Sequence, residues 1–342
     1  MKLQTVCINA LDSRHAKPTF IDFRYPPVTD LHKIVITELN ENDCERVIHL
    51  INSVQPHIPW DKEQFHWQYF GRAGHQAKLF GATHEQQLVG FYAAVRNKFL
   101  FKSFVRDVFM VQDVMTSESF RGQGILHLLG EKCASAIDES GSIGLTFPNE
   151  KSANSFRRLG WTEVMGVPLR EAGCVKSDID SALQFSQVAE FGNSVEEIWN
   201  ESGLRIGIQR DAEYLNWRYS KPATQYLKFI VGKDVGYLVL KLYTGDKVPK
   251  LHLLDLVMKE KELESTGEVL KFVFSIANDL GASLVTCWLP SGHMYEDYFS
   301  NSGFLTINSH NRSIFVRDHY DGDIPSAGGG QWHFSQGDSD VF

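Results

Sequence analysis

A short pattern of aspartate, glutamate, tryptophan and tyrosine occurs twice in the sequence at identical offsets. The two copies read Asp61-Lys-Glu-Gln-Phe-His-Trp67-Gln-Tyr69 and Asp211-Ala-Glu-Tyr-Leu-Asn-Trp217-Arg-Tyr219. A pattern that returns at a long interval is typical of a structural unit that occurs more than once in a chain. The repeat therefore predicts a duplicated fold, with one copy in each half of the protein.

Only the first half continues into a glycine-rich loop. There, Asp113 is followed by Arg121-Gly-Gln-Gly124, whereas Asp255 in the second half is followed by Lys259-Glu-Lys-Glu-Leu-Glu-Ser-Thr-Gly-Glu268. The four glutamates of the second segment would repel a phosphate group. We therefore expect one working ligand site, in the first half. We expect the second half to support the first or to form one wall of an acceptor site, since ligands often bind between domains.

The composition is that of an ordinary globular protein with two domains. At roughly 150 residues per domain, a chain of 342 residues predicts two of them. The net charge of −8 argues against a general nucleic-acid binder. The five cysteines are odd in number and widely spaced, which favours a reducing compartment. Neither a signal peptide nor a membrane span is apparent, so we expect a cytoplasmic protein.

The patterns along the chain divide it into five parts. These are an N-terminal extension (1–30), a first domain (31–168), a linker (169–190), a second domain (191–320) and a tail (321–342). The tail is rich in glycine and then in aromatic and acidic residues, among them Trp332, Phe334, Asp338 and Asp340. Such a tail either closes over an acceptor site as a lid or is docked or disordered elsewhere.

Strands and helices follow one another in the same order in both domains. In the first domain, strands are expected over 34–39, 78–82, 88–95, 108–115 and 142–147, and helices over 44–51, around Trp67, over 125–137 and over 152–159. In the second domain, the corresponding segments are 195–199, 226–231, 235–240, 251–257, 269–277 and 283–288.

The glycine loop of the first half lies between a predicted strand and a predicted helix. Unpaired backbone N–H groups at the start of a helix, together with the helix dipole, form an anion site. Gly122 and Gly124 would let the backbone approach phosphate oxygens closely. The loop lacks the Lys-Ser/Thr of the Walker motif and the third glycine of the dinucleotide-binding motif. By itself, it fits a tight turn as well as a phosphate site.

The wider context of the loop resembles the GNAT superfamily of acyl-CoA N-acetyltransferases. Arg121, Gly124 and Asn149 match the superfamily motifs Q/R-x-x-G-x-G/A and N-x-x-A-x-x-x-Y-x-x-x-G-F, and Trp161 replaces the final phenylalanine. The resemblance covers about residues 34–165 and, more faintly, 193–305. It implies an α/β fold of the α+β type. Two tandem GNAT-like domains, the second degenerate, would each form a mixed, mostly antiparallel sheet flanked by helices.

The resemblance implies acetyl-CoA as the co-substrate and no metal. The residues that it assigns to coenzyme A are Val114, Met115, Thr116, Arg121, Gly122, Gln123, Gly124, Ile125, Leu126, Asn149, Ser152 and Phe156. Two of them depart from the superfamily pattern. Leu126 stands where Gly or Ala is usual. Phe156 stands where many members have a tyrosine proposed to protonate the leaving thiolate, so that role is vacant or is filled by water or another residue.

Acetyl transfer from a thioester needs a neutral amine, a polarised carbonyl group and close positioning. The resemblance implies that the backbone N–H of Val114 donates a hydrogen bond to the acetyl oxygen. It also places Asp113 near the acceptor amine, where it would take the amine proton through water or hold an ammonium group. The alternative is that Asp113 points away and caps a turn.

Several other residues have more than one interpretation. Trp67 and Tyr69 are expected to pack in the core, because the half without a glycine loop keeps their counterparts. The histidines near the expected sites are read as surface or packing residues: His57, His66 and His127. Basic residues on the helix after Asn149 either contact the 3′-phosphate of the coenzyme or form a solvated face: Lys151, Arg157 and Arg158.

The sequence thus predicts an N-acetyltransferase that acts by direct attack in a ternary complex, as a monomer or homodimer. The acceptor would be a primary amine of a small molecule, with an amino sugar as one candidate. Two alternatives remain open. Fem-type aminoacyl transferases duplicate the same fold but use charged tRNA. A non-catalytic acyl-CoA-binding protein would explain the missing tyrosine.

Overall fold

The structure is a computed structural model that describes residues 33–72, 74, 76–174, 183–318 and 329–339. The expected N-terminal extension, 1–30, and Asp340 of the tail lie outside these residues. None of the described helices is long and apolar enough to cross a membrane. The described cysteines are all unpaired thiols.

The first half of the chain contains every strand and helix that its sequence predicts. Its strands are β1 (Ile34–Leu39), β2 (Lys78–His84), β3 (Gln87–Phe101), β4 (Phe104–Thr116), β5 (Ile143–Thr146) and β6 (Thr162–Gly173). Its helices are α1 (Cys44–Val54), α2 (Lys62–Phe70), α3 (Ile125–Glu139) and α4 (Glu150–Arg158). Short 3-10 turns, η2 (Glu41–Asp43) and η3 (Glu118–Phe120), precede α1 and the glycine loop.

The second half repeats this order and adds short elements. Its strands are β7 (Phe185–Val188), β8 (Ile206–Ile208), β9 (Leu227–Val231), β10 (Gly236–Tyr243), β11 (Lys250–Met258), β12 (Leu284–Trp288), β13 (Leu305–Arg317) and β14 (Trp332–His333). Its helices are α5 (Ser194–Asn200), α6 (Ala212–Arg218), α7 (Thr266–Asp279) and α8 (Glu296–Asn301), and its 3-10 turns are η4 (Glu260–Ser265), η6 (Gly329–Gln331) and η7 (Gln336–Asp338).

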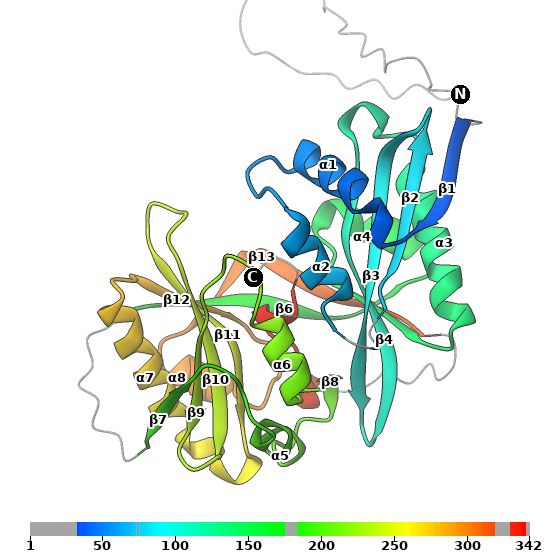
Figure 1. Ribbon diagram of the computed structural model, residues 1–342. Coiled ribbons are helices and arrows are strands. Elements are labelled where there is room, and N and C mark those ends of the chain that lie inside the picture. The colour runs from blue at the N-terminus through cyan, green and yellow to red at the C-terminus, as the bar shows by residue number, and fades with distance from the viewer. Residues whose placement is uncertain (1–32, 73, 75, 175–182, 319–328, 340–342) are drawn as a thin grey trace, which may run out of the picture.

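The strands of both halves form one continuous sheet, in the order β1-β2-β3-β4-β5-β13-β6-β12-β11-β10-β9-β7 (Figure 1). Most neighbours are antiparallel. The pairs β4 with β5 and β11 with β12 are parallel, and α3 and α7 make the crossovers that parallel strands require. The predicted fold class, a mixed α/β structure with a mostly antiparallel sheet flanked by helices, is confirmed.

The two halves exchange strands at the centre of the sheet. Strand β13, from the second half, lies between β5 and β6 and is antiparallel to both. Strand β6, from the first half, pairs on its other edge with β12. Each half of the sheet is therefore completed by a strand of the other. The predicted linker, 169–190, is wrong, because β6 and β7 occupy most of its described residues, and the predicted boundary at 168 cuts through β6.

The crossover helices pack on the sheet through side chains at helical spacing. In α3, the residues that face the sheet are Ile125, Leu129, Cys133 and Ile137, and all four are buried. In α7, Val269 and Val273 do the same. Burial of such a stripe accounts for most of the stability of an amphipathic helix, and it fixes the start of α3 beside β4.

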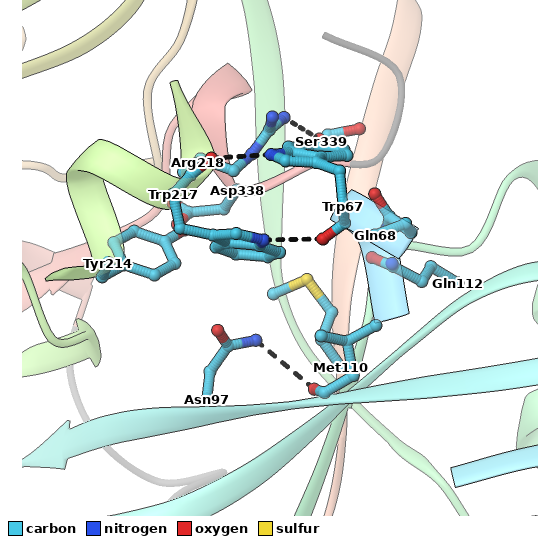
Figure 2. A pocket seen from close by; sticks show the side chains of 11 residues that line it. Trp67, Gln68, Asn97, Met110, Gln112, Tyr214, Trp217, Arg218, Asp338 and Ser339 are labelled. Atoms are coloured by element: carbon cyan, nitrogen blue, oxygen red, sulfur yellow. Dashed lines mark hydrogen bonds between the residues drawn. The ribbon is translucent and has the colours of Figure 1, made fainter. Parts of the chain in front are cut away.

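The repeated motif has the same structural role in both halves. Asp61 and Asp211 are the N-caps of α2 and α6, where each side chain accepts a hydrogen bond from the backbone N–H three residues further on. Trp67 and Trp217 stack with ring centres 5.4 Å apart. Each indole N–H donates to the other residue's backbone carbonyl at 2.8 Å (Figure 2). Trp67 was predicted to pack in the core, but it is half-buried and packs instead on its own counterpart across the interface.

The described part of the tail is docked, and it is buried from Trp332 to Ser339. The side chains of Trp332 and Phe334 are fully buried. Strand β14 pairs with β8, and β8 pairs in turn with the end of β3, so the tail connects the second half to the first. The Arg218 guanidinium donates hydrogen bonds to the backbone carbonyls of Gly337 and Ser339. The described part of the tail is therefore a structural element of the interface between the halves.

Candidate functional site

The glycine loop joins β4 to α3, as predicted. Gly122 and Gly124 have φ angles of 76° and 81°, which glycine adopts most readily. A Cβ at either position would meet no protein atom, so the space beside the loop is open. The backbone N–H groups of Arg121 and His127 each donate a hydrogen bond to a backbone carbonyl. The amides between these positions lie at the N-terminus of α3, where an anion would accept hydrogen bonds from them.

Just before the loop, β4 contains a bulge. Tyr92 of β3 lies opposite both Asp113 and Val114, and regular pairing continues on either side. Asp113 has a φ of 52°, which is uncommon for a residue other than glycine. Bulges disrupt the hydrogen-bond ladder and re-aim side chains, and they occur often beside active sites. The bulge thus separates Asp113 and Val114 from the regular ladder at the edge of the cleft.

The side chain of Asp113 is held by a buried tyrosine. The Tyr69 hydroxyl donates a hydrogen bond of 2.8 Å to the Asp113 carboxylate. Tyr69 is buried, whereas Asp113 is only partly buried and lines a cavity. Asp113 therefore does not point away from the site as the cap of a turn. The packing role predicted for Tyr69 is confirmed, with this hydrogen bond in addition.

Two cavities meet at the bulge. The first has a volume of about 460 Å³ and extends along the glycine loop. The second has a volume of about 640 Å³ and lies between the two halves. The residues common to both linings are Val54, Gln55, Val114, Leu126, Asn149 and Ser152. A ligand in the first cavity and a ligand in the second would therefore come together beside Val114 and Asp113.

Most of the predicted coenzyme site lies in the first cavity. Its lining includes Val114, Met115, Thr116, Arg121, Gly122, Gly124, Ile125, Leu126, Asn149 and Ser152. Gln123 does not line it, because its side chain turns back to the Ser119 carbonyl. Phe156 lines the second cavity and packs edge-to-face on Trp161.

Asn149 has a structural role besides its place in the cleft. Its side chain caps α4 by accepting a hydrogen bond of 3.0 Å from the Ser152 N–H. Such a cap satisfies an otherwise unpaired donor at the helix start. The asparagine of the predicted motif therefore shapes the wall shared by the two cavities.

The second half contributes a wall of the second cavity. Its lining residues from that half are Lys221, Trp288, Arg312, Asp338 and Ser339. Of these, the sequence motifs point to Asp338 alone, as an acidic residue of the tail. Lys221, Trp288 and Arg312 lie in segments with no motif, and strand exchange brings β13 beside β5. Local patterns carry no signal for that placement.

The loop between α1 and α2 forms another wall of the second cavity. Trp60 is fixed there because its backbone N–H and carbonyl both hydrogen-bond to the Asn52 side chain, at 2.7 and 3.0 Å. His57 also lines the cavity and is exposed, as expected for a surface histidine. A third cavity, beside the Trp67–Trp217 pair (Figure 2), measures only about 20 Å³ and has room for little more than a water molecule.

The position in the second half that corresponds to Asp113 is filled by protein. Asp255 is fully buried, and it pairs with the Arg210 guanidinium at 3.1 Å and with His333 of the tail at 2.8 Å. Burial alone would raise the pKa of Asp255, but the charges of Arg210 and His333 hold this pKa well below its usual range. Arg210 also pairs with Asp338 at 2.7 Å. Asp255 is thus part of a buried charge network.

Comparison with known proteins supports the fold. The chain matches no protein-family model and no curated protein. Among solved structures, it is similar to a GCN5-related N-acetyltransferase from Anabaena variabilis (TM-score 0.64, 15% identity, 83% of this chain and 72% of that one). It is also similar to the N-myristoyltransferase of Saccharomyces cerevisiae with bound myristoyl-CoA (TM-score 0.59, 10% identity, 86% and 85% of the two chains). The chain therefore has the GCN5-related N-acetyltransferase fold.

Proposed function

We propose that this protein transfers an acyl group, most simply acetyl, from a coenzyme A thioester to a primary amine of a small molecule. The observation that carries the proposal is the meeting of two cavities at the β4 bulge. One cavity runs along the glycine loop, the proposed phosphate site, and the other is lined by Asp113. This is the arrangement that direct transfer between two bound substrates needs.

The proposed reaction begins when the amine nitrogen attacks the thioester carbonyl carbon. A C–N bond forms, and the carbonyl electrons move to oxygen, where the Val114 N–H is the proposed hydrogen-bond donor. The C–S bond then breaks and the sulfur leaves as a thiolate. The amine proton passes to Asp113 directly or through water, a water molecule protonates the thiolate, and the proton held by Asp113 then neutralises the resulting hydroxide. Tyr69 would keep the Asp113 carboxylate oriented throughout.

Phe156 gives weight to a second candidate, an acyl-CoA-binding protein without catalysis. Its ring is buried among aromatic side chains and offers no proton to a leaving thiolate. The two candidates differ in turnover alone. Release of free thiol from acetyl-CoA with a panel of amines would support the transferase, and tight binding without release would support the other.

Binding of the coenzyme can be tested independently of turnover. We expect calorimetry to give one acetyl-CoA per chain. Ligand at about 100 times its dissociation constant should stabilise the fold by roughly 2.7 kcal/mol. Two molecules per chain, or no thermal shift with coenzyme A, would contradict the proposal.

We further propose that the two halves are copies of one ancestral unit and that the second copy no longer binds coenzyme A. Tyr69 donates to Asp113 at 2.8 Å, and Tyr219 lies 3.4 Å from Asp255 in the same relative position. Gly267 is a helical residue of α7 without a positive φ, so the second half has no equivalent of the glycine loop.

A further inference from the structure

Arg312 is a cationic side chain in the wall of the second cavity. It lies on β13, the strand that the second half contributes to the centre of the sheet, and it is half-buried. The β13 register shifts immediately before it, between Ile307 and Arg312. Such an irregularity re-aims the strand locally.

The charge of Arg312 is not matched by a carboxylate within the described part of the chain, where it forms no ion pair. Arg317, on the same strand, shows the contrast. Its guanidinium is clamped by both carboxylate oxygens of Asp138, at 3.0 and 2.6 Å. Arg317 thus has a structural partner and lies away from the cavity, whereas Arg312 lines the cavity.

The acidic residues that line the cavity accept hydrogen bonds from other groups of the protein. Asp338 accepts hydrogen bonds from the Arg210 guanidinium, the Tyr214 hydroxyl and the Ser335 backbone N–H. Asp113 accepts from Tyr69 at the other end of the cavity. The wall formed by the second half therefore presents the positive charge of Arg312 to the cavity.

Sheet geometry separates Arg312 from Asp113. Strands β4 and β13 both pair with β5, one on each edge. Two steps between neighbouring strands put their backbones about 10 Å apart. An acceptor with its amine at Asp113 would therefore extend its other end toward Arg312.

We propose that Arg312 binds an anionic group, a carboxylate or a phosphate, of the acceptor. The acceptor is then an amine that carries its negative charge several bonds away from the reacting nitrogen. A guanidinium is well suited to this role, since it binds carboxylates and phosphates through two parallel hydrogen bonds. The inference rests on the proposed acyl transfer and adds the substrate class.

The test uses matched amines with and without an anion. Glucosamine 6-phosphate is compared with glucosamine, and 6-aminohexanoate with hexylamine, each with acetyl-CoA and the full-length protein. We expect kcat/KM to favour the charged member of at least one pair by about 10- to 100-fold, the range of a hydrogen bond to a charged group. The phosphate pair and the carboxylate pair distinguish the two anions.

Substitution assigns the preference to Arg312. In Arg312→Gln, KM for the preferred charged amine should rise by about 10- to 100-fold while the neutral amine is unaffected. Arg312→Lys should recover part of the preference, because it keeps the charge. Lys271→Gln, which removes an exposed positive charge from α7, serves as the control and should change neither value.

Equal use of both members of each pair by the wild type, or use of neither charged amine, would overturn the inference. So would an equal loss of activity toward charged and neutral amines in Arg312→Gln. Coenzyme A binding is measured in parallel by calorimetry. Its absence would instead refute the proposed acyl transfer, so the two failures are distinguishable.

Discussion

Asp113 and Asp255 occupy equivalent positions in different surroundings. In the first half, Met110 is the last residue of β4 that pairs with the parallel strand β5, and Asp113 follows three residues later. In the second half, His252 is the last residue of β11 that pairs with the parallel strand β12, and Asp255 follows three residues later. Asp113 faces a cavity and has a tyrosine partner, whereas Asp255 is buried with an arginine and a histidine. We therefore expect a chemical role for Asp113 and a structural role for Asp255, and substitution should separate these roles.

Replacement of Asp113 by asparagine tests the chemical role. Asparagine keeps the shape of the side chain but cannot accept the amine proton, so kcat should fall by about 10²–10⁴-fold. Affinity for coenzyme A should change little, because the carboxylate lies on the acceptor side of the bulge. Steady-state kinetics and calorimetry check the two expectations. Full activity would mean that the amine attacks without a base.

Replacement of Asp255 by asparagine should lower stability instead. Loss of one partner from a buried ion pair costs about 3–5 kcal/mol. The folded pKa of Asp255 is depressed, so its stabilisation is present above the unfolded value of about 3.9 and is lost as the pH falls below it. Denaturant unfolding should therefore show a weaker decline toward acid in Asp255→Asn than in the wild type. Parallel pH profiles for the two proteins would contradict this assignment.

At the scale of elements, the glycine loop offers a matched pair of substitutions. Gly124→Glu places a side chain and a negative charge beside the loop amides, so coenzyme A binding should be lost. Gly267→Glu introduces the same charge at the start of α7, where a Cβ meets no protein atom, and should leave binding unchanged. Gly124→Ala adds a Cβ at a φ of 81° but no charge, so it measures the effect of backbone strain alone. Calorimetry with coenzyme A measures all three, and equal losses in both halves would refute the asymmetry.

The elements near the loop could be predicted because their signals are local. The apolar run before Asp113, the glycines at 122 and 124 and the helical spacing of Ile125, Leu129 and Cys133 all lie within one short stretch. They sufficed to predict β4, the loop and α3, whereas the residues expected around the first cavity came from the resemblance to the GNAT superfamily. The internal repeat likewise predicted the order of elements in the second half.

The rest could not be predicted because it depends on long-range pairing. Nothing in the residues of β6 or β13 specifies which strand lies beside them, and the exchange places Arg312 and Trp288 in the cavity. The sequence of the tail is compatible with a lid and with a docked or disordered end. Its burial depends on Arg210 and Arg218, which bind it from far away in the chain.

At the scale of the whole molecule, the exchanged strands make the halves dependent on one another. Without β13, the first half would expose the edge of β5, and without β6 the second half would expose the edge of β12. Unpaired strand edges of this kind promote aggregation. The interface also contains the Trp67–Trp217 pair and the buried tail. The two halves should therefore unfold in a single cooperative transition.

Cutting the chain between β6 and β7 tests this dependence. We expect residues 1–176 alone to be insoluble or unfolded and to bind no coenzyme A, although they contain the whole glycine loop, because β13 is missing from their sheet. Co-expression with residues 177–342 should restore a soluble complex, since both exchanged strands are then present. Gel filtration of the pair and calorimetry with coenzyme A measure the result. A first half that folds and binds coenzyme A alone would contradict this dependence and show that its sheet does not need β13.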